Sequence, residues 1–256
     1  MSPFRHRIGG EFDTRRASLT AALALPIALA ILVLSPGDLR PQEVVATAVP
    51  TAADLAERAA ELDEAIPALR EATARFRDVE VALAEGYVRD PMNLCITAPV
   101  EGHPPQLGGM GIHFFRPDLL GLTETEPRVN GTGVHTDFSN PSVLVYFPDE
   151  EGELRLGAIE NLVFRDAWLR AGNSEPPEFH GHEYWALADN PATPDVDEAH
   201  MFEPHYELHL WIHEENPNGV AFPFNPNVSC KGHDGPTTLA EGVEWAKSHA
   251  PPPGGS

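Results

Sequence analysis

Three histidines stand four residues apart in the segment HYELHLWIH, residues 205–213. They are His205, His209 and His213, with Glu207 and Trp211 between them. Imidazole and carboxylate groups are natural ligands for zinc, copper, iron and manganese at neutral pH. Four-residue steps are compatible with one side of a helix and with one face of a strand. The segment is therefore a metal-binding strand, a metal-binding helix or a buried strand with a polar face.

The residues between the histidines favour a strand. The even positions are all apolar or aromatic, namely Tyr206, Leu208, Leu210 and Ile212. This strict alternation predicts a strand over residues 205–214, preceded by Pro204 and followed by the turn sequence ENPNG. Neighbours on one face of a strand lie roughly 7 Å apart, so the three histidines do not readily share one ion. We expect His209 to bind the metal, with His205, Glu207, Trp211 and His213 flanking it.

Two other segments offer the remaining ligands. His113 follows a glycine-rich stretch in GGMGIHFF, residues 108–115, where small residues allow close backbone approach. Glu160 interrupts the apolar run LGAIENLVF, residues 156–164, and a carboxylate there is costly to bury unless it is paired or coordinated. Together with His209, these residues form a two-histidine, one-carboxylate set that leaves positions open on a metal.

Structural roles compete with each of these assignments. His113 could be a hydrogen-bonded structural residue, and Glu160 could pair with Arg155 or Arg165 or lie at a sheet edge. Three further histidines fall in a long polar segment and are interpreted as solvated, although the first two could add to a site or bind metal adventitiously. They are His180, His182 and His200.

Several other chemistries are excluded. The chain contains no His-Glu-x-x-His, no Gly-x-Ser-x-Gly and no glycine-rich phosphate loop. The His180-Gly181-His182 pair resembles a cupin motif, but the rest of that motif does not fit. A net charge of −22, with only Lys231 and Lys247 as lysines, argues against a nucleic-acid partner.

The surrounding pattern predicts an α+β fold. Apolar residues spaced three, four or seven apart follow Thr51 and indicate an amphipathic helix that Pro67 kinks or divides and that Gly86 ends. The predicted strands are residues 111–115, 142–147, 154–164 and 205–214, and the second and third form a hairpin. A short helix is predicted over residues 164–172, a long loop over 173–200 and a last helix over 239–249.

The N-terminal region predicts export. Residues 17–34 form an uncharged, largely apolar run behind a basic segment that ends in Arg15-Arg16. We interpret residues 1–48 as an export signal or membrane anchor with a linker. Residues 49–250 then form one globular domain, and residues 251–256 form a flexible tail. The predicted location is periplasmic or extracellular, with any membrane contact confined to the N-terminal segment. The sequence leaves open whether the leader is cleaved.

The two cysteines support the same location. Cys95 and Cys230 allow one intramolecular pairing, and in an oxidising compartment we expect a disulfide. On the chain-entropy account, so long a loop would contribute roughly 4–5 kcal/mol. The alternative is a pair of buried free thiols.

Residues 76–230 also resemble a group of uncharacterised exported bacterial proteins. The shared motifs are G-M-G-x-H, L-H-x-W, N-P-x-G and N-P-x-V-S-C, with a glutamate strand between the first two. The matching residues are Gly109, Met110, Gly111, His113, Glu160, Leu208, His209, Trp211, Asn216, Pro217, Gly219, Asn225, Pro226, Val228, Ser229 and Cys230. Around Glu160 this chain has Ile159 and Asn161, so the tyrosine of that motif is absent. The resemblance implies export but no particular activity.

These observations predict a kinked N-terminal helix packed on an antiparallel sheet or half-barrel, held by one disulfide. The first functional hypothesis is an exported metal-binding protein or mononuclear metalloenzyme, with His113, Glu160 and His209 holding zinc, copper, iron or manganese. The alternative is a non-enzymatic envelope protein that binds a small ligand and uses the histidine strand structurally. A third is an envelope protein that acts through its acidic surface. The sequence does not decide whether the protein is an enzyme.

Overall fold

The structure, a computed structural model, describes residues 52–125, 128–193 and 196–249. All of them belong to one unit, Val49–Ser256. The predicted export segment, the linker and the C-terminal tail lie outside the described residues. Within the part of the chain that is described, no helix is both long enough and apolar enough to cross a membrane.

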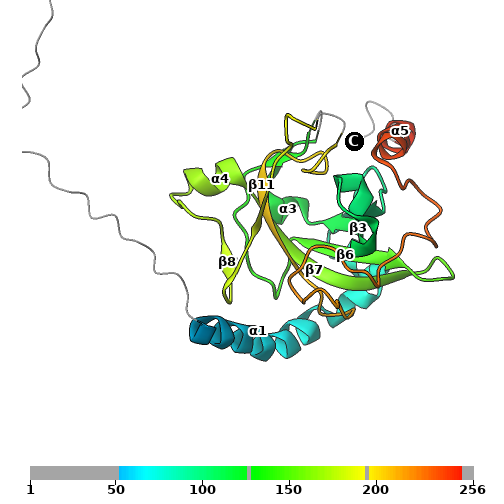
Figure 1. The fold of residues 1–256 in the computed structure, drawn as a ribbon. Coiled ribbons are helices and arrows are strands. Elements are labelled where there is room, and N and C mark those ends of the chain that lie inside the picture. The colour runs from blue at the N-terminus through cyan, green and yellow to red at the C-terminus, as the bar shows by residue number, and fades with distance from the viewer. Residues whose placement is uncertain (1–51, 126–127, 194–195, 250–256) are drawn as a thin grey trace, which may run out of the picture. The chain divides into compact units, whose positions relative to one another are not determined.

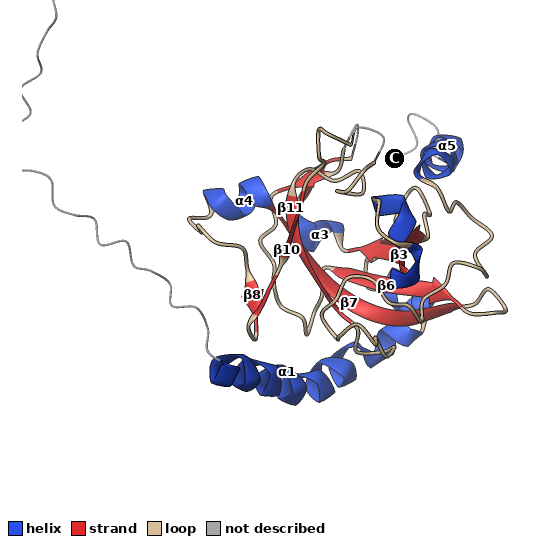
Figure 2. Ribbon diagram, in the orientation of Figure 1, coloured by secondary structure: helices blue, strands red, loops and turns tan. Residues whose placement is uncertain are grey.

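An antiparallel sheet forms the centre of the fold, as predicted (Figure 1, Figure 2). Its strand order is β1-β3-β6-β7-β11-β10, with β2 beside β3. The strands are β1 Val88–Arg89, β2 Ile96–Thr97, β3 Gly109–Phe115, β6 Val143–Pro148, β7 Leu154–Phe164, β10 Trp185–Leu187 and β11 His205–Leu210. Strands β1 and β10 end the two sides without pairing to each other, so the sheet stays open and does not close into a barrel. The hairpin predicted from the acidic turn is β6–β7.

The N-terminal helical region covers one face of this sheet. Helix α1 (Ala52–Thr73) runs through Pro67 without a break, and the division falls later, at the 3-10 turn η1 (Ala74–Arg77) before α2 (Val79–Ala84). Asp78 begins α2, where its side chain accepts a hydrogen bond from the backbone N–H of Glu80 at 3.0 Å. Gly86 follows α2 with a φ of +94°, the left-handed geometry expected after a helix.

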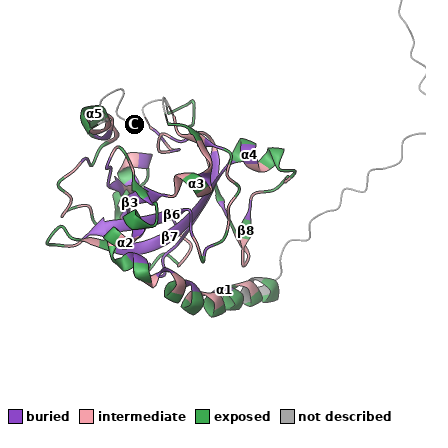
Figure 3. Ribbon diagram, turned by 180° about the vertical axis from the view of Figure 1, so that it is seen from behind, coloured by how far each residue is buried: buried purple, intermediate pink, exposed green. Residues whose placement is uncertain are grey.

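The solvent-facing side of α1 is exposed, whereas the central strands are buried (Figure 3). Shorter elements complete the described part of the chain. They are η2 Ala98–Glu101, η3 Pro105–Leu107, α3 Pro117–Leu120, β4 Leu122–Glu124, β5 Asn130–Gly131, α4 Arg165–Arg170, β8 Glu178–Phe179, β9 His182–Glu183 and α5 Leu239–His249. The predicted loop 173–200 thus contains β8, β9 and β10. The predicted final helix matches α5.

The two faces of the sheet differ in chemistry because successive side chains of a strand alternate in direction. On the helix face, residues such as Tyr206, Leu208 and Leu210 join a core that includes Leu62 and Phe76. The opposite face carries His113, Glu160, His205, Glu207 and His209, all buried although they are polar. Apolar clusters flank them on both sides, and they centre on Phe164 with Phe202 and on Trp211 with Val228. The polar group is therefore enclosed in the interior.

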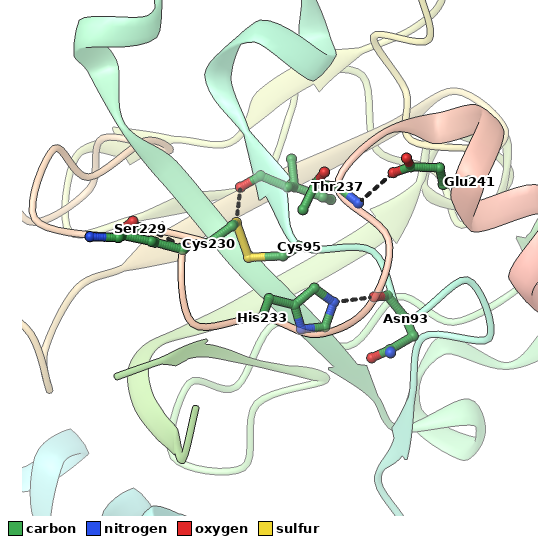
Figure 4. Close-up of a disulfide and its surroundings, with 9 residues drawn as sticks. Asn93, Cys95, Ser229, Cys230, His233, Thr237 and Glu241 are labelled. Atoms are coloured by element: carbon green, nitrogen blue, oxygen red, sulfur yellow. Dashed lines mark hydrogen bonds between the residues drawn. A yellow bond between two sulfur atoms is a disulfide. The ribbon is translucent and has the colours of Figure 1, made fainter. Parts of the chain in front are cut away.

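A disulfide ties the covering segments together. Cys95 and Cys230 are bonded, which confirms the predicted bridge (Figure 4). Nearby, Nε2 of His233 donates to the backbone carbonyl of Asn93 at 2.8 Å, and the backbone N–H of Cys95 donates to the carbonyl of Pro236 at 3.1 Å. The bridge therefore anchors the segment that enters β2 to the C-terminal part of the chain.

Strand β11 is shorter than predicted. It ends at Leu210, because Trp211 N–H bonds to Val220 O at 2.8 Å and His213 N–H bonds to Gly157 O at 3.1 Å, outside the β7–β11 ladder. Gly157 is the extra residue where the register between β6 and β7 shifts. The alternating sequence was read correctly as a strand, but its last residues leave the ladder and turn away.

Candidate metal centre

Strand pairing brings two of the three predicted ligands together. Glu160 on β7 and His209 on β11 are direct cross-strand partners. Side chains of directly opposed residues on one face have Cβ atoms about 4.5–5.5 Å apart, within reach of one ion. Nε2 of His209 lies 3.1 Å from Oε2 of Glu160.

His113 reaches the same carboxylate from β3, across the intervening strand β6. Its cross-strand partner is Val145, which in turn pairs with Ala158 on β7. These small apolar residues leave space above the sheet, and Nε2 of His113 lies 3.3 Å from Oε2 of Glu160. Gly111 lies two residues earlier with a φ of +108°, and a Cβ there would stand 2.3 Å from the carbonyl oxygen of Tyr146. The glycine-rich stretch therefore permits the close β3–β6 approach that positions His113.

Two of the three separations between the ligand atoms match those of a coordination site. Adjacent ligands about 2.0–2.1 Å from an ion in octahedral or tetrahedral geometry lie about 2.8–3.4 Å from one another. The two Nε2–Oε2 distances, 3.1 and 3.3 Å, fall in this range, and all three ligand atoms lie within 4.8 Å of one another. Oε2 of Glu160 and Nε2 of His209 nevertheless lack a partner with hydrogen-bond geometry. Close polar atoms that do not point along a hydrogen bond are expected where lone pairs converge on a cation.

The electrostatics favour a charged carboxylate in this group. Burial alone raises the pKa of Glu160, but the adjacent imidazoles of His209 and His113 outweigh burial and hold that pKa well below its usual range. Burial likewise lowers the pKa of His209, but the carboxylates of Glu160 and Glu207 outweigh it and raise the pKa above its ordinary value. The ion partners of Glu160 in the described chain are both histidines. Arg155 and Arg165, the alternatives considered from sequence, do not fill this role.

A small cavity adjoins two of the three residues, His113 and Glu160, whereas His209 does not line it. It has a volume of about 20 Å³ and is lined by His113 and Glu160 together with His200, His205 and Glu207. One water needs roughly 10–15 Å³ of such space, so the cavity admits about one water-sized ligand but no organic molecule. An ion held by the three residues would therefore keep an open coordination position.

The structure places three of the predicted flanking residues, His205, Glu207 and Trp211, beside His209 or its neighbours. Oε1 of Glu207 stands 3.7 Å from Nδ1 of His209, and Oε2 of Glu207 stands 3.2 Å from Nε2 of His205. Nδ1 of His205 is 3.0 Å from the carbonyl oxygen of Glu203. Trp211 stacks beside His209 at a ring distance of 6.5 Å and donates from Nε1 to the carbonyl of Phe222 at 2.7 Å. The charge of Glu207 helps to raise the pKa of His209, although at 3.7 Å its Oε1 makes no hydrogen bond to that ring.

Three residues around the cavity were missed or misassigned from sequence. His200 was predicted to be solvated, but its side chain is only 8% exposed and its Nε2 lies 2.6 Å from Oε1 of Glu101. Burial alone lowers the pKa of His200, but the Glu101 carboxylate outweighs burial and raises it to about 10. Asp90 also lines the cavity, and burial raises its pKa. Glu101 and Asp90 form no pattern in the sequence, and the one hint was Cys95, whose bridge fixes their segment.

The loop that carries His200 is held by Arg128. This guanidinium contacts Asp189 at 2.8 Å and Asp197 at 3.2 Å, and it donates to the carbonyl of Phe202. His200 itself has a φ of +51°, a conformation that costs a non-glycine residue about 1–3 kcal/mol. A buried ion pair and a clamped loop thus hold this histidine in a strained conformation at the edge of the cavity.

The structure places His213 away from the candidate centre, contrary to prediction. Because the chain turns after Leu210, its ring lies on the helix face, with Nε2 at 2.9 Å from Oγ1 of Thr73 in α1. The Thr73 hydroxyl already donates to the carbonyl of Leu69 at 2.7 Å, so Nε2 of His213 must be the donor. Burial, with Arg77 and Arg70 nearby, lowers the pKa of His213 to about 4.

The lowered pKa of His213 predicts how the free energy of unfolding depends on pH. Between about pH 6.5 and 4 the unfolded chain protonates His213 while the folded protein does not, so acidification favours unfolding. His213→Gln keeps a donor but cannot titrate. As pH falls through this window, the free energy of unfolding of the wild type should drop by about 1–2 kcal/mol more than that of the variant, after allowance for solvent screening. Urea unfolding at pH 7 and pH 4.5 measures this difference, and parallel pH curves would contradict it.

The remaining histidine pair lies apart from the centre. His180 and His182 are partly exposed, and Nδ1 of His180 is 3.4 Å from Oε2 of Glu61 in α1. Neither lines the cavity beside Glu160.

Comparisons with known proteins add no further assignment: no protein-family model, no curated protein and no solved structure matches this chain. The site therefore defines the class of protein by its own geometry. It is a buried His-His-Glu group that could hold a metal ion, on an open antiparallel sheet in an α+β fold.

Proposed function

We propose that this protein is an exported metal-binding protein in which His113, Glu160 and His209 hold one divalent transition metal. The observation that carries the proposal is the convergence of three buried ligand atoms within 4.8 Å of one another. Glu160 Oε2 and His209 Nε2 also lack partners with hydrogen-bond geometry, a feature that the ion-paired atoms of Glu101 and His200 share, so the convergence of the three ligands carries the proposal. Leaving a buried polar group unsatisfied typically costs about 1–3 kcal/mol, a cost that coordination would remove.

The donor set narrows the choice of metal. Two imidazoles and one carboxylate suit zinc, copper, iron or manganese, and they leave coordination positions open. The cavity of about 20 Å³ gives a water-sized ligand access to these positions. A bound water or hydroxide there is the usual starting point of metal-assisted chemistry, so a mononuclear metalloenzyme is the form of this function that we favour.

Export is part of the same proposal. The Cys95–Cys230 bridge is typical of an oxidising compartment. The basic and apolar N-terminal residues, which lie outside the described part of the chain, suit an export signal or an anchor at residues 17–34. We place the globular region in the periplasm or outside the cell.

Metal content tests the proposal. The tag-free protein is stripped with chelator, incubated separately with zinc, copper, iron(II) and manganese, desalted and measured by elemental mass spectrometry. The wild type should retain one equivalent of at least one metal. Glu160→Gln and His209→Gln should each retain less than a tenth of that amount, because each removes one of three ligands.

Matched controls separate coordination from surface binding. Glu183→Gln and His249→Ala change exposed residues and should leave the metal content at one equivalent. Less than about a tenth of an equivalent of every metal in the wild type would refute the metal centre. Full occupancy in both ligand variants would show that the metal is bound elsewhere.

A further inference from the structure

A second, larger cavity lies next to the candidate metal centre. Its volume is about 270 Å³, and its walls include Trp185, Phe222 and Phe224. Trp185 is 48% exposed, whereas Phe224 is buried, so the cavity runs from the surface into the interior. We refer to it as the aromatic chamber.

Glu207 connects the aromatic chamber to the metal centre. It lines both cavities and is itself only 2% exposed. In the β10–β11 pair it lies directly opposite Trp185, so the indole and the carboxylate share one face of the sheet. Oε1 of Glu207 has no hydrogen-bond partner in the described residues, and Nδ1 of His209 is 3.7 Å from it. A residue that lines the aromatic chamber thus carries a buried acceptor without a hydrogen-bond partner.

The sizes of the two cavities assign them different roles. The cavity beside Glu160, at about 20 Å³, has no room for an organic molecule. The aromatic chamber, at about 270 Å³, approaches the lower limit of about 300 Å³ for sites that bind small molecules. An organic ligand that approaches the metal centre would therefore be held in the chamber.

The charges of the chamber indicate the kind of ligand. Three glutamates line it, Glu101, Glu198 and Glu207, together with one histidine, His103, and no lysine or arginine does. The chain as a whole carries a net charge of −22, so an anion would be repelled. Carboxylates accept hydrogen bonds only, and aromatic faces attract cations. A ligand with an ammonium group and an apolar body satisfies both features.

We propose that the aromatic chamber binds a small aromatic or alkyl amine, with its ammonium group on Glu207 and its apolar body against Trp185, Phe222 and Phe224. The role of this amine as a substrate rests on the proposed metal centre, whereas its binding to the chamber does not.

Calorimetric titration of the tag-free, metal-stripped protein with 2-phenylethylamine tests this inference. Binding should be saturable. Trp185→Ala, at an exposed edge-strand position that folding tolerates, should weaken it about tenfold, and Glu207→Gln should weaken it about tenfold or more. Trp245→Ala, on α5 and outside the chamber, should leave the affinity unchanged. The neutral analogue 2-phenylethanol should bind more weakly, and the anion 3-phenylpropanoate should not bind.

Three results would overturn the inference: no saturable binding of 2-phenylethylamine, equal affinities for Trp185→Ala and the wild type, or tighter binding of the anion. Metal content measured on parallel reconstituted samples keeps the two proposals distinct. Amine binding in a protein that retains no metal would support the chamber and refute the metal centre. Metal retention without amine binding would support the metal centre and refute the chamber.

Discussion

Saturation with its metal should raise the free energy of unfolding of this protein by about 4 kcal/mol, and Glu160→Gln should abolish that gain. A ligand that binds only the folded state stabilises it in proportion to the logarithm of its concentration over Kd, and a thousandfold excess over Kd gives about 4.1 kcal/mol. The site requires β3, β7 and β11 to be in register, so the unfolded chain does not present it. Urea unfolding followed by circular dichroism, with metal and with chelator, measures the gain.

Glu160→Gln also distinguishes coordination from a structural ion pair, because it preserves shape and removes one charge. If Glu160 only paired with His113 and His209, the variant would lose about 3–5 kcal/mol in chelator, and metal would not stabilise the wild type. If Glu160 is a ligand, the main loss appears in the presence of metal. Glu183→Gln, an exposed change, should follow the wild type under both conditions. Equal metal-induced gains in Glu160→Gln and the wild type would contradict this ligand assignment.

Removal of the disulfide should have a comparable effect. The double variant Cys95→Ala, Cys230→Ala should lose about 3–5 kcal/mol of unfolding free energy, because the bridge joins residues 135 positions apart and restricts the unfolded chain. Cys95 is fully buried, so the alanines also remove packing. Unfolding of the wild type with a reductant isolates the contribution of the bond from that of the side chains. A loss below about 1 kcal/mol in both measurements would contradict the expectation.

The same variant should affect the metal centre. The bridge anchors the segment that carries Asp90, which lines the cavity, and Glu101, which pairs with the cavity residue His200. When this cover is released, water enters the centre and the ligands lose some of their orientation. Metal dissociation, followed by transfer to a chromogenic chelator, should be faster in the double variant than in the wild type. An unchanged rate would show that the sheet alone holds the ligands.

The local chemistry of the sequence was sufficient to predict several residues of the candidate site. Alternation placed His209 on a strand, and the cost of burying a carboxylate identified Glu160 as an unusual residue. The glycines before His113 indicated close backbone approach, and the position of Gly111 against β6 agrees. The pairing of Cys95 with Cys230 needed only their number and an oxidising compartment. The inferences about His209, Glu160 and His113 depend on a residue and its immediate neighbours, and the inference about the cysteines depends on their number.

Tertiary structure decided which side chains come together, because these contacts depend on strand register and on the paths of the loops. No local pattern in the sequence predicts that Glu160 pairs with His209. Nor does one predict that the side chain of His113 extends across β6, where Val145 and Ala158 are small enough to leave space. The same alternation that placed His209 also suggested a place for His213, but backbone bonds to Gly157 turn that residue to the helix face. His200 lies in a polar segment that predicts solvation, yet Arg128 and Glu101 hold it inside. The sequence by itself therefore determined which side chains are costly to bury, and only the folded chain decided which of them meet.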